Sequence, residues 1–271
     1  MKDLEKYYTI LFKQAHKIER SNDFIEGLFI LTAVAANFVE GHIIWIASIF
    51  ALLLQLIIFY LKKLQRYYET IGHKVQEFSM LNSFYKASTF DFDISQIIGS
   101  LNPKLHKIAK EQPDNPQSSE YLTDSETSNK LLGMIQENSF WNHHLFRYCY
   151  KKSVVKIIIW VLLIVLGILF SIGTNLADKN YYFHRTLLLF ITANLLWNEL
   201  DKVWSWYNAS KAMLSIDNSI SRHENPSQDF VIHTFSLYTF TKSISPLIND
   251  KTYNKNQSKL NNGWEVRVQN K

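Results

Sequence analysis

The apolar residues of the chain are concentrated in four segments that form two closely spaced pairs. Phe24–Val39 and Ile43–Tyr60 are joined by Glu40-Gly41-His42, and a short connector joins Val154–Ile172 to Tyr182–Leu196. A helix of about 20 residues crosses the ~30 Å core of a bilayer. The pattern therefore predicts two helical hairpins in a membrane. The alternative is a set of buried helices in a soluble bundle, although such helices usually keep a polar stripe.

The segments outside these spans also have helical patterns. Leu61–Phe90 has apolar residues at spacings of three and four, which predicts a helix continuing the second span, and Thr123–Tyr150 has a similar face before the third. Asn102-Pro103 predicts the start of a short helix, whereas Phe90–Gly99 predicts a turn.

The tail has a less regular pattern. Trp197–Ser221 predicts a helix that continues the fourth span. Phe230–Ser243 is ambiguous between strand and helix, and helix is favoured. Pro246–Lys271 holds isolated apolar residues in a polar stretch. We expect an all-α membrane protein with four transmembrane helices and helical cytoplasmic extensions.

Basic residues near the span ends predict the orientation in the membrane, because cytoplasmic loops carry an excess of Lys and Arg. The turn at 40–42 has none, and the second turn has Lys179 and Arg185. The opposite ends carry most of them: Lys13, Lys17, Arg20, Lys62, Lys63, Arg66, Lys74, Arg147, Lys151, Lys152, Lys156, Lys202 and Lys211. Both termini are therefore expected in the cytoplasm. The expected parts are an N-terminal helix at 1–23, a first hairpin at 24–61, a helical sensor region at 62–152, a second hairpin at 153–200 and a helical C-terminal region at 201–271.

The composition and motifs argue against an enzyme. The chain has 8 Gly, 5 Pro and a single cysteine, Cys149, which excludes an internal disulfide and a CxxC metal site. Glycine-rich nucleotide loops, GxSxG and HExxH are absent. His143 and His144 near Cys149 lack further metal ligands, and Glu137 with His143 could form an acid–base pair but has no nucleophile. We expect no catalytic residues, no metal and no cofactor.

Polar residues within the spans are candidates for lining a pore, because such groups usually face a bundle interior or water rather than lipid. Hydrogen bonding between helices of one subunit is the alternative, and Glu40 could simply be a solvated turn residue. The candidates are Thr32, Asn37, Glu40, Gln55, Asn194 and Asn198.

Basic and aromatic residues where the spans enter the cytoplasm are candidates for binding a nucleotide, because Arg and Lys hold phosphates and aromatic rings stack on bases. Contact with lipid headgroups would explain the residues close to the membrane equally well. The candidates are Arg66, His73, Lys74, Lys86, Arg147, Tyr148 and Lys151.

Two passages resemble a known family. Met134–Tyr148 contains an Ile-Gln-Glu stretch, an aromatic pair, and then Leu and Arg before the third span. The second passage has Pro246, Ile248, Tyr253, Lys255, Leu260, Asn261 and Trp264. Together with the paired spans, they resemble the SMODS-associated four-transmembrane (S-4TM) pore-forming effectors. The middle region departs from the family pattern, so no ligand residue is carried over.

The resemblance implies an anti-phage defence effector in the inner membrane of a bacterial cell. Such effectors are encoded beside a nucleotidyltransferase, whose cyclic or linear oligonucleotide product opens the pore or, as in Hailong systems, holds it shut. We therefore expect a homo-oligomeric ion channel, such as a tetramer, whose opening depolarises the membrane and causes growth arrest or death. The alternative is a non-channel membrane scaffold or tethered binding module. Ligand identity, gating sign, ion selectivity and subunit number stay open.

Overall fold

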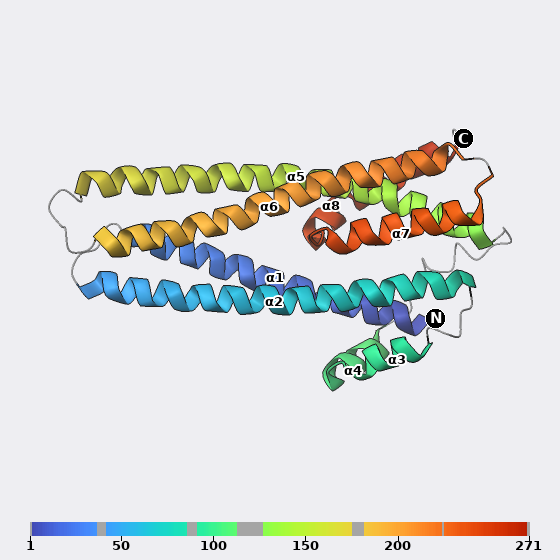
Figure 1. Cartoon of the computed structure of the whole chain (residues 1–271), viewed down its shortest axis with the longest axis horizontal. Coiled ribbons are helices and arrows are strands. Elements are labelled where there is room, and N and C mark those ends of the chain that lie inside the picture. Colours follow the sequence, from blue (N-terminus) through green and yellow to red (C-terminus); the bar gives the residue numbers. More distant parts are fainter. Residues whose placement is uncertain are drawn as a thin grey trace. The chain divides into compact units, whose positions relative to one another are not determined.

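The computed structural model describes residues 2–36, 42–85, 91–112, 127–174, 182–223 and 225–269, and within these ranges all regular structure is helical (Figure 1). The expectation of an all-α fold is confirmed for these residues. The helices are α1 (Lys2–Ala35), α2 (His42–Tyr85), α3 (Asp91–Gly99), α4 (Pro103–Glu111), α5 (Thr127–Thr174), α6 (Tyr182–Ser221), α7 (Gln228–Ile244) and α8 (Asp250–Gln269).

Local chemistry explains several helix ends. The side chain of Asn102 accepts a hydrogen bond from the Lys104 amide at 2.9 Å, and Pro103 takes the first turn of α4, where its missing N–H costs nothing. The Ser227 hydroxyl accepts one from the Phe230 amide at 3.3 Å at the start of α7. The helix predicted to begin at Asn102-Pro103 is confirmed, and the ambiguous Phe230–Ser243 segment is helical.

The turn predicted at Phe90–Gly99 is wrong, because Asp91–Gly99 forms helix α3. Ile97 and Ile98 of this short helix pack against a buried cluster that includes Leu4, Leu11 and Val75. Tertiary packing therefore supplies the stability that nine residues lack alone. Helix α8, whose isolated apolar residues show no clear period in the sequence, also packs on its neighbours, since Leu260 is buried and the Trp264 ring lies 5.6 Å from that of Phe140.

The structure divides into two compact units. Unit 1 comprises Met1–His16, Arg66–Tyr148 and Trp206–Lys271, and unit 2 comprises Lys17–Gln65 and Cys149–Ser205. The boundaries fall inside α1, α2, α5 and α6, so each of these four helices contributes residues to both units.

Unit 1 has a buried core built by its N-terminal helices. Leu4, Leu11, Val75 and Leu101 form one cluster, and Ile10, Leu105 and Ala109 form a second, with Tyr7 and Tyr68 packed against both. The Tyr7 hydroxyl lies 2.9 Å from His106 Nδ1, which joins α1 to α4. At Gly72 the two long helices approach closely: a Cβ there would lie 2.9 Å from the ring of Phe12.

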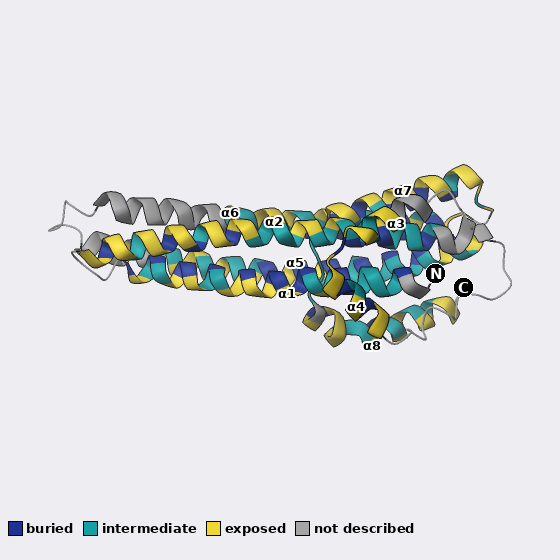
Figure 2. Ribbon diagram, turned by 90° about the horizontal axis from the view of Figure 1, so that it is seen from below, coloured by how far each residue is buried: buried dark blue, intermediate teal, exposed yellow. Residues whose placement is uncertain are grey.

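Unit 2 packs α1 against α2 but leaves a wide apolar surface uncovered. Phe29, Ala33, Ala51 and Ile58 belong to its buried cluster. Large apolar side chains elsewhere on α2 and α5 are exposed (Figure 2). On α2 they include Ile43, Trp45, Ile46, Ile49, Leu52, Leu53, Leu56 and Phe59, and on α5 Val155, Ile158, Ile159, Leu162, Val165, Leu166 and Leu169.

One stretch of the described chain, His42–Leu81, is long and apolar enough to cross a membrane, and only 22% of its most apolar window is buried within the protein. A water-soluble protein rarely exposes so continuous an apolar face. This helix is compatible with a location in a membrane.

Candidate functional site

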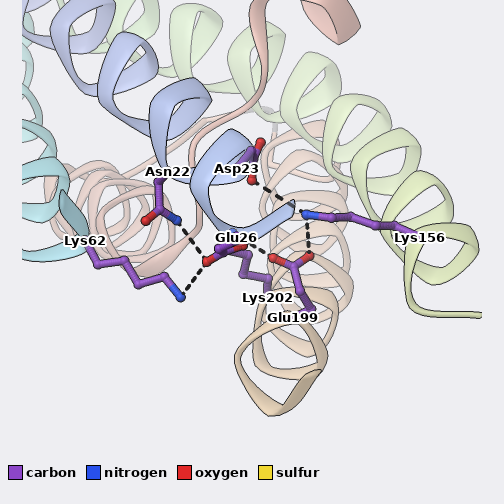
Figure 3. A network of polar contacts seen from close by, with 7 residues as sticks. All are labelled: Asn22, Asp23, Glu26, Lys62, Lys156, Glu199 and Lys202. Atoms are coloured by element: carbon purple, nitrogen blue, oxygen red, sulfur yellow. Dashed lines mark hydrogen bonds and ion pairs between the residues drawn. The ribbon is translucent and has the colours of Figure 1, made fainter. Parts of the chain in front are cut away.

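A layer of buried charge joins the four long helices within unit 2 (Figure 3). On α1, the Glu26 side chain is almost completely buried, at 2% exposed. Its Oε1 atom accepts from Lys62 Nζ on α2 at 2.9 Å and from Asn22 Nδ2 at 2.9 Å. The Glu26 carboxylate therefore ties α1 to α2.

The second half of this layer is built around Glu199 on α6, whose side chain is 3% exposed. Glu199 Oε2 lies 3.3 Å from Lys156 Nζ on α5, and Oε1 lies 3.0 Å from Lys202 Nζ. Lys156 also reaches Asp23 Oδ1 on α1 at 3.6 Å. We call Asn22, Asp23, Glu26, Lys62, Lys156, Glu199 and Lys202 the ion layer.

The three carboxylates of the ion layer could in principle hold a cation, because one oxygen of each lies within 4.8 Å of the others. The three lysines already supply positive charge at these oxygens. Burial lowers the pKa of Lys202, but the carboxylates of Glu199, Glu26, Asp23 and Glu19 outweigh it and raise that pKa. The arrangement is therefore that of an ion-pair network linking helices.

The four apolar segments lie on the same side of the ion layer. The segments on α1 and α5 extend along the chain after Glu26 and Lys156, and those on α2 and α6 come before Lys62 and Glu199. Figure 1 shows that all four apolar segments extend from this layer toward the same end of unit 2.

Unit 1 holds a cavity of about 710 Å³, within the usual range for small-molecule sites. Helices α1, α2, α5, α7 and α8, with the segment before α8, contribute its walls. The lining residues are Phe12, His16, His73, Gln76, Met134, Glu137, Asn138, Trp141, Asn142, Leu145, Lys242, Leu247, Ile248, Tyr253, Asn261, Trp264 and Glu265.

Aromatic rings form much of this cavity. The rings of Trp141 and Tyr253 lie 6.0 Å apart with an angle of 39° between their planes. Phe12 meets His73 edge to face at 5.0 Å. Burial, with a smaller contribution from Lys242, lowers the pKa of His73 to about 3, so this imidazole is neutral at physiological pH.

Lys242 lies between this cavity and a smaller one of about 280 Å³, because it lines both together with His73 and Gln76. Its ammonium donates to the Tyr238 hydroxyl at 3.5 Å and lies 5.8 Å from the centre of that ring. Burial lowers the pKa of Lys242 to about 8. Within the part of the chain that the structure describes, no carboxylate forms an ion pair with it.

The two passages that resemble the effector family both line the cavity. Met134, Glu137, Asn138, Trp141, Asn142 and Leu145 come from the first, and Leu247, Ile248, Tyr253, Asn261 and Trp264 from the second. Sequence reasoning had singled out both passages but assigned no ligand role to these residues. These two passages could therefore have been used to predict the cavity lining from the sequence. No sequence feature distinguishes Lys242 as a lining residue.

The seven residues predicted to bind a nucleotide are not gathered in this cavity. His73 alone of the described ones lines it. Arg66, Lys74 and Arg147 are exposed, and Tyr148 is half-buried. Lys151 is exposed in unit 2, and Lys86 lies outside the described residues.

The predicted pore-lining residues have different surroundings. Thr32 donates to the Leu28 carbonyl of its own helix at 2.9 Å. Gln55 Oε1 is buried without a hydrogen-bond partner among the described residues, and Asn198 is half-buried. Asn37, Glu40 and the side chain of Asn194 lie outside the described part.

Of the catalytic and metal candidates from the sequence, His143 contacts helix α6. His143 Nδ1 lies 2.8 Å from the Ser210 carbonyl oxygen, and the Ser210 hydroxyl donates to the His143 carbonyl at 3.0 Å. These bonds join α5 to α6. Glu137 lines the cavity but His143 does not, so this cavity does not hold the pair together.

No protein-family model, no curated protein and no solved structure matches the chain.

Proposed function

We propose that the protein is a four-span membrane protein that assembles into an ion-conducting pore gated by a nucleotide bound on the cytoplasmic side. The observation that carries this proposal is the ion layer, from which all four apolar segments extend in one direction. Charged residues at one level, with mostly apolar helix beyond it, are expected where helices enter a bilayer.

The exposed apolar side chains of α2 and α5 support the membrane location. Beyond the ion layer they face outward in the isolated chain, and lipid would cover them without loss of any polar contact. From the excess of Lys and Arg near these helix ends, we propose that both termini lie on the cytoplasmic side.

A pore requires water-facing polar groups, and α2 carries two that lack partners among the described residues. Ser48 Oγ and Gln55 Oε1 are both buried and make no hydrogen bond there. They are seven residues apart and so share one helix face. One subunit of four apolar helices is too small to enclose a wide pore, so we propose a homo-oligomer such as a tetramer.

The four long helices give a physical route for gating, because each runs without interruption from unit 2 into unit 1. A ligand that prefers one helix arrangement in unit 1 would shift the same helices in the membrane. The resemblance adds the biological setting: anti-phage defence, an oligonucleotide made by a partner nucleotidyltransferase, and membrane depolarisation.

The test is ion flux through the purified protein in potassium-loaded liposomes, followed with a potential-sensitive dye. We expect flux that cyclic dinucleotides or linear oligonucleotides switch on or off. Gln55→Leu should reduce the flux, whereas Leu53→Val, a conservative change on an exposed neighbour, should leave it unchanged. Absence of flux with every nucleotide would favour the membrane scaffold instead.

A further inference from the structure

The cavity of unit 1 presents a half-buried cation that lacks a negatively charged partner among the described residues. Lys242 contacts the Tyr238 hydroxyl and lines both cavities, but it forms no ion pair with the described residues. A charged group withdrawn from water without a counter-charge is costly. An anionic group of a ligand at this position would supply the missing charge.

A second unsatisfied group lies in the same wall. The indole N–H of Trp141 is buried and has no hydrogen-bond partner among the described residues. A buried donor without an acceptor also destabilises the folded state. Trp141 and Lys242 both line the cavity, so one ligand can offer acceptors to both.

The remaining walls suit a planar ring with polar edges. Trp141, Tyr253 and Trp264 contribute aromatic rings to the lining, and aromatic rings stack on bases. Gln76, Asn138 and Asn261 offer amide donors and acceptors, and Glu137 offers a carboxylate that can accept from an amino group. A nucleobase combines a planar ring with both kinds of edge.

The charged residues that line the cavity limit the number of phosphate groups on a ligand that can bind there. Lys242 is the one lysine or arginine among the described lining residues, which also include Glu137 and Glu265. His73 is neutral. A triphosphate would leave several negative charges without cations and close to two carboxylates, which costs binding free energy.

We infer that the cavity binds one nucleobase together with a single phosphate beside Lys242 and discriminates against polyphosphates. The inference rests on the proposed function, since it assigns the nucleotide to this cavity in place of the exposed basic residues singled out in the sequence. For an oligonucleotide, it means that one terminal nucleotide enters the cavity while the rest of the chain stays outside.

The test is calorimetric titration of the full-length protein in detergent or nanodiscs with AMP, GMP, CMP and UMP. We expect at least one monophosphate to bind, and the same base as triphosphate or as free nucleoside to bind at least about tenfold more weakly. Inorganic phosphate alone should not bind measurably. Equal or tighter binding of the triphosphate, or no binding of any monophosphate, would overturn the inference.

Variants locate the binding to this cavity. Lys242→Met keeps the length of the side chain and should weaken binding of the monophosphate at least about tenfold, and Trp141→Phe keeps a ring but removes the N–H. Lys251→Met, at an exposed lysine of α8, should bind like the parent protein. Unchanged affinity in both cavity variants would contradict the assignment. If Lys242→Met does not fold, Trp141→Phe still tests whether the ligand binds in this cavity.

The binding and flux measurements can refute the binding site and the gated pore independently of each other. Binding in the cavity without nucleotide-dependent flux would retain the site and refute the gated pore. Nucleotide-dependent flux that Lys242→Met and Trp141→Phe leave unchanged would retain the pore and refute this site.

Discussion

Lys202 in unit 2 and Lys242 in unit 1 are both largely withdrawn from solvent, yet their neighbours differ. Lys202 contacts Glu199 at 3.0 Å, and the nearby carboxylates raise its pKa despite burial. Lys242 has a tyrosine hydroxyl as its polar neighbour, and burial lowers its pKa to about 8. Unit 2 therefore compensates its buried charges with internal ion pairs, whereas Lys242 in unit 1 has no ion pair among the described residues.

This difference distinguishes lysines that stabilise the fold through ion pairs from a lysine proposed to bind a ligand. In the ion layer, each of three lysines forms an ion pair with at least one of three carboxylates, so removing a carboxylate takes compensation away from its lysine partners. At Lys242 the charge itself is the unpaired group, so its removal relieves the folded state. The two lysines should respond to mutation with opposite signs in stability.

The largest effect is expected for Glu199→Leu. It removes the carboxylate between Lys156 and Lys202 and leaves their ammonium groups with much less compensation, so we expect a loss of about 3–5 kcal/mol in the free energy of unfolding. Equilibrium unfolding of the detergent-solubilised protein measures it. Asp201→Leu, at an exposed acid two residues away, is the matched control and should change stability by less than about 0.5 kcal/mol. A loss below about 1 kcal/mol at Glu199 would mean that water solvates the ion layer.

A smaller effect of opposite sign is expected for Lys242→Met. Replacing a half-buried ammonium that lacks an ion pair with an apolar side chain of similar length should leave stability unchanged or raise it by about 1–2 kcal/mol. The same unfolding experiment measures it, with Lys251→Met as the control. A loss larger than about 1 kcal/mol would show that Lys242 has a compensating partner in the folded protein. A gain in stability together with a loss of nucleotide binding would identify a residue kept for function.

The sequence predicted the helices better than their side-chain contacts. The apolar pattern was sufficient to predict helices α2, α5 and α6, because a long apolar run can be recognised from the sequence alone. It failed for α3, a helix of nine residues held by packing on Leu4, Leu11 and Val75. Short helices carry too few apolar positions to show a period.

Both sites depend on residues that are distant in the chain. The sequence predicts that Lys156 extends toward the membrane surface. It does not show that Lys156 pairs with Glu199, which is 43 residues away in the chain but lies 3.3 Å from it in the structure. The cavity likewise combines residues from five helices. Of these, the passages around Trp141 and Trp264 were noticed only through a resemblance, and Lys242 has no distinguishing neighbour in sequence.

The smallest expected effect is the pH dependence that Lys242 adds to stability. Its pKa is about 8 in the folded protein, against a usual value of 10.5. Between these values the unfolded chain binds more protons than the folded one, so the free energy of unfolding should rise with pH across this window. The full cost of the buried charge is present below about pH 8 and is lost above pH 10.5.

Lys242→Met isolates this contribution, because the other titratable groups around the cavity remain in both proteins. These groups are His16 on α1, His73 and Glu77 on α2, Glu137 on α5, Tyr238 on α7, and Tyr253 and Glu265 on α8. The difference in unfolding free energy between variant and parent should shrink from pH 8 to pH 10, as measured at intervals of half a pH unit. A difference independent of pH would mean that Lys242 keeps an ordinary pKa. The opposite behaviour of the two buried lysines would then have to arise from packing rather than charge.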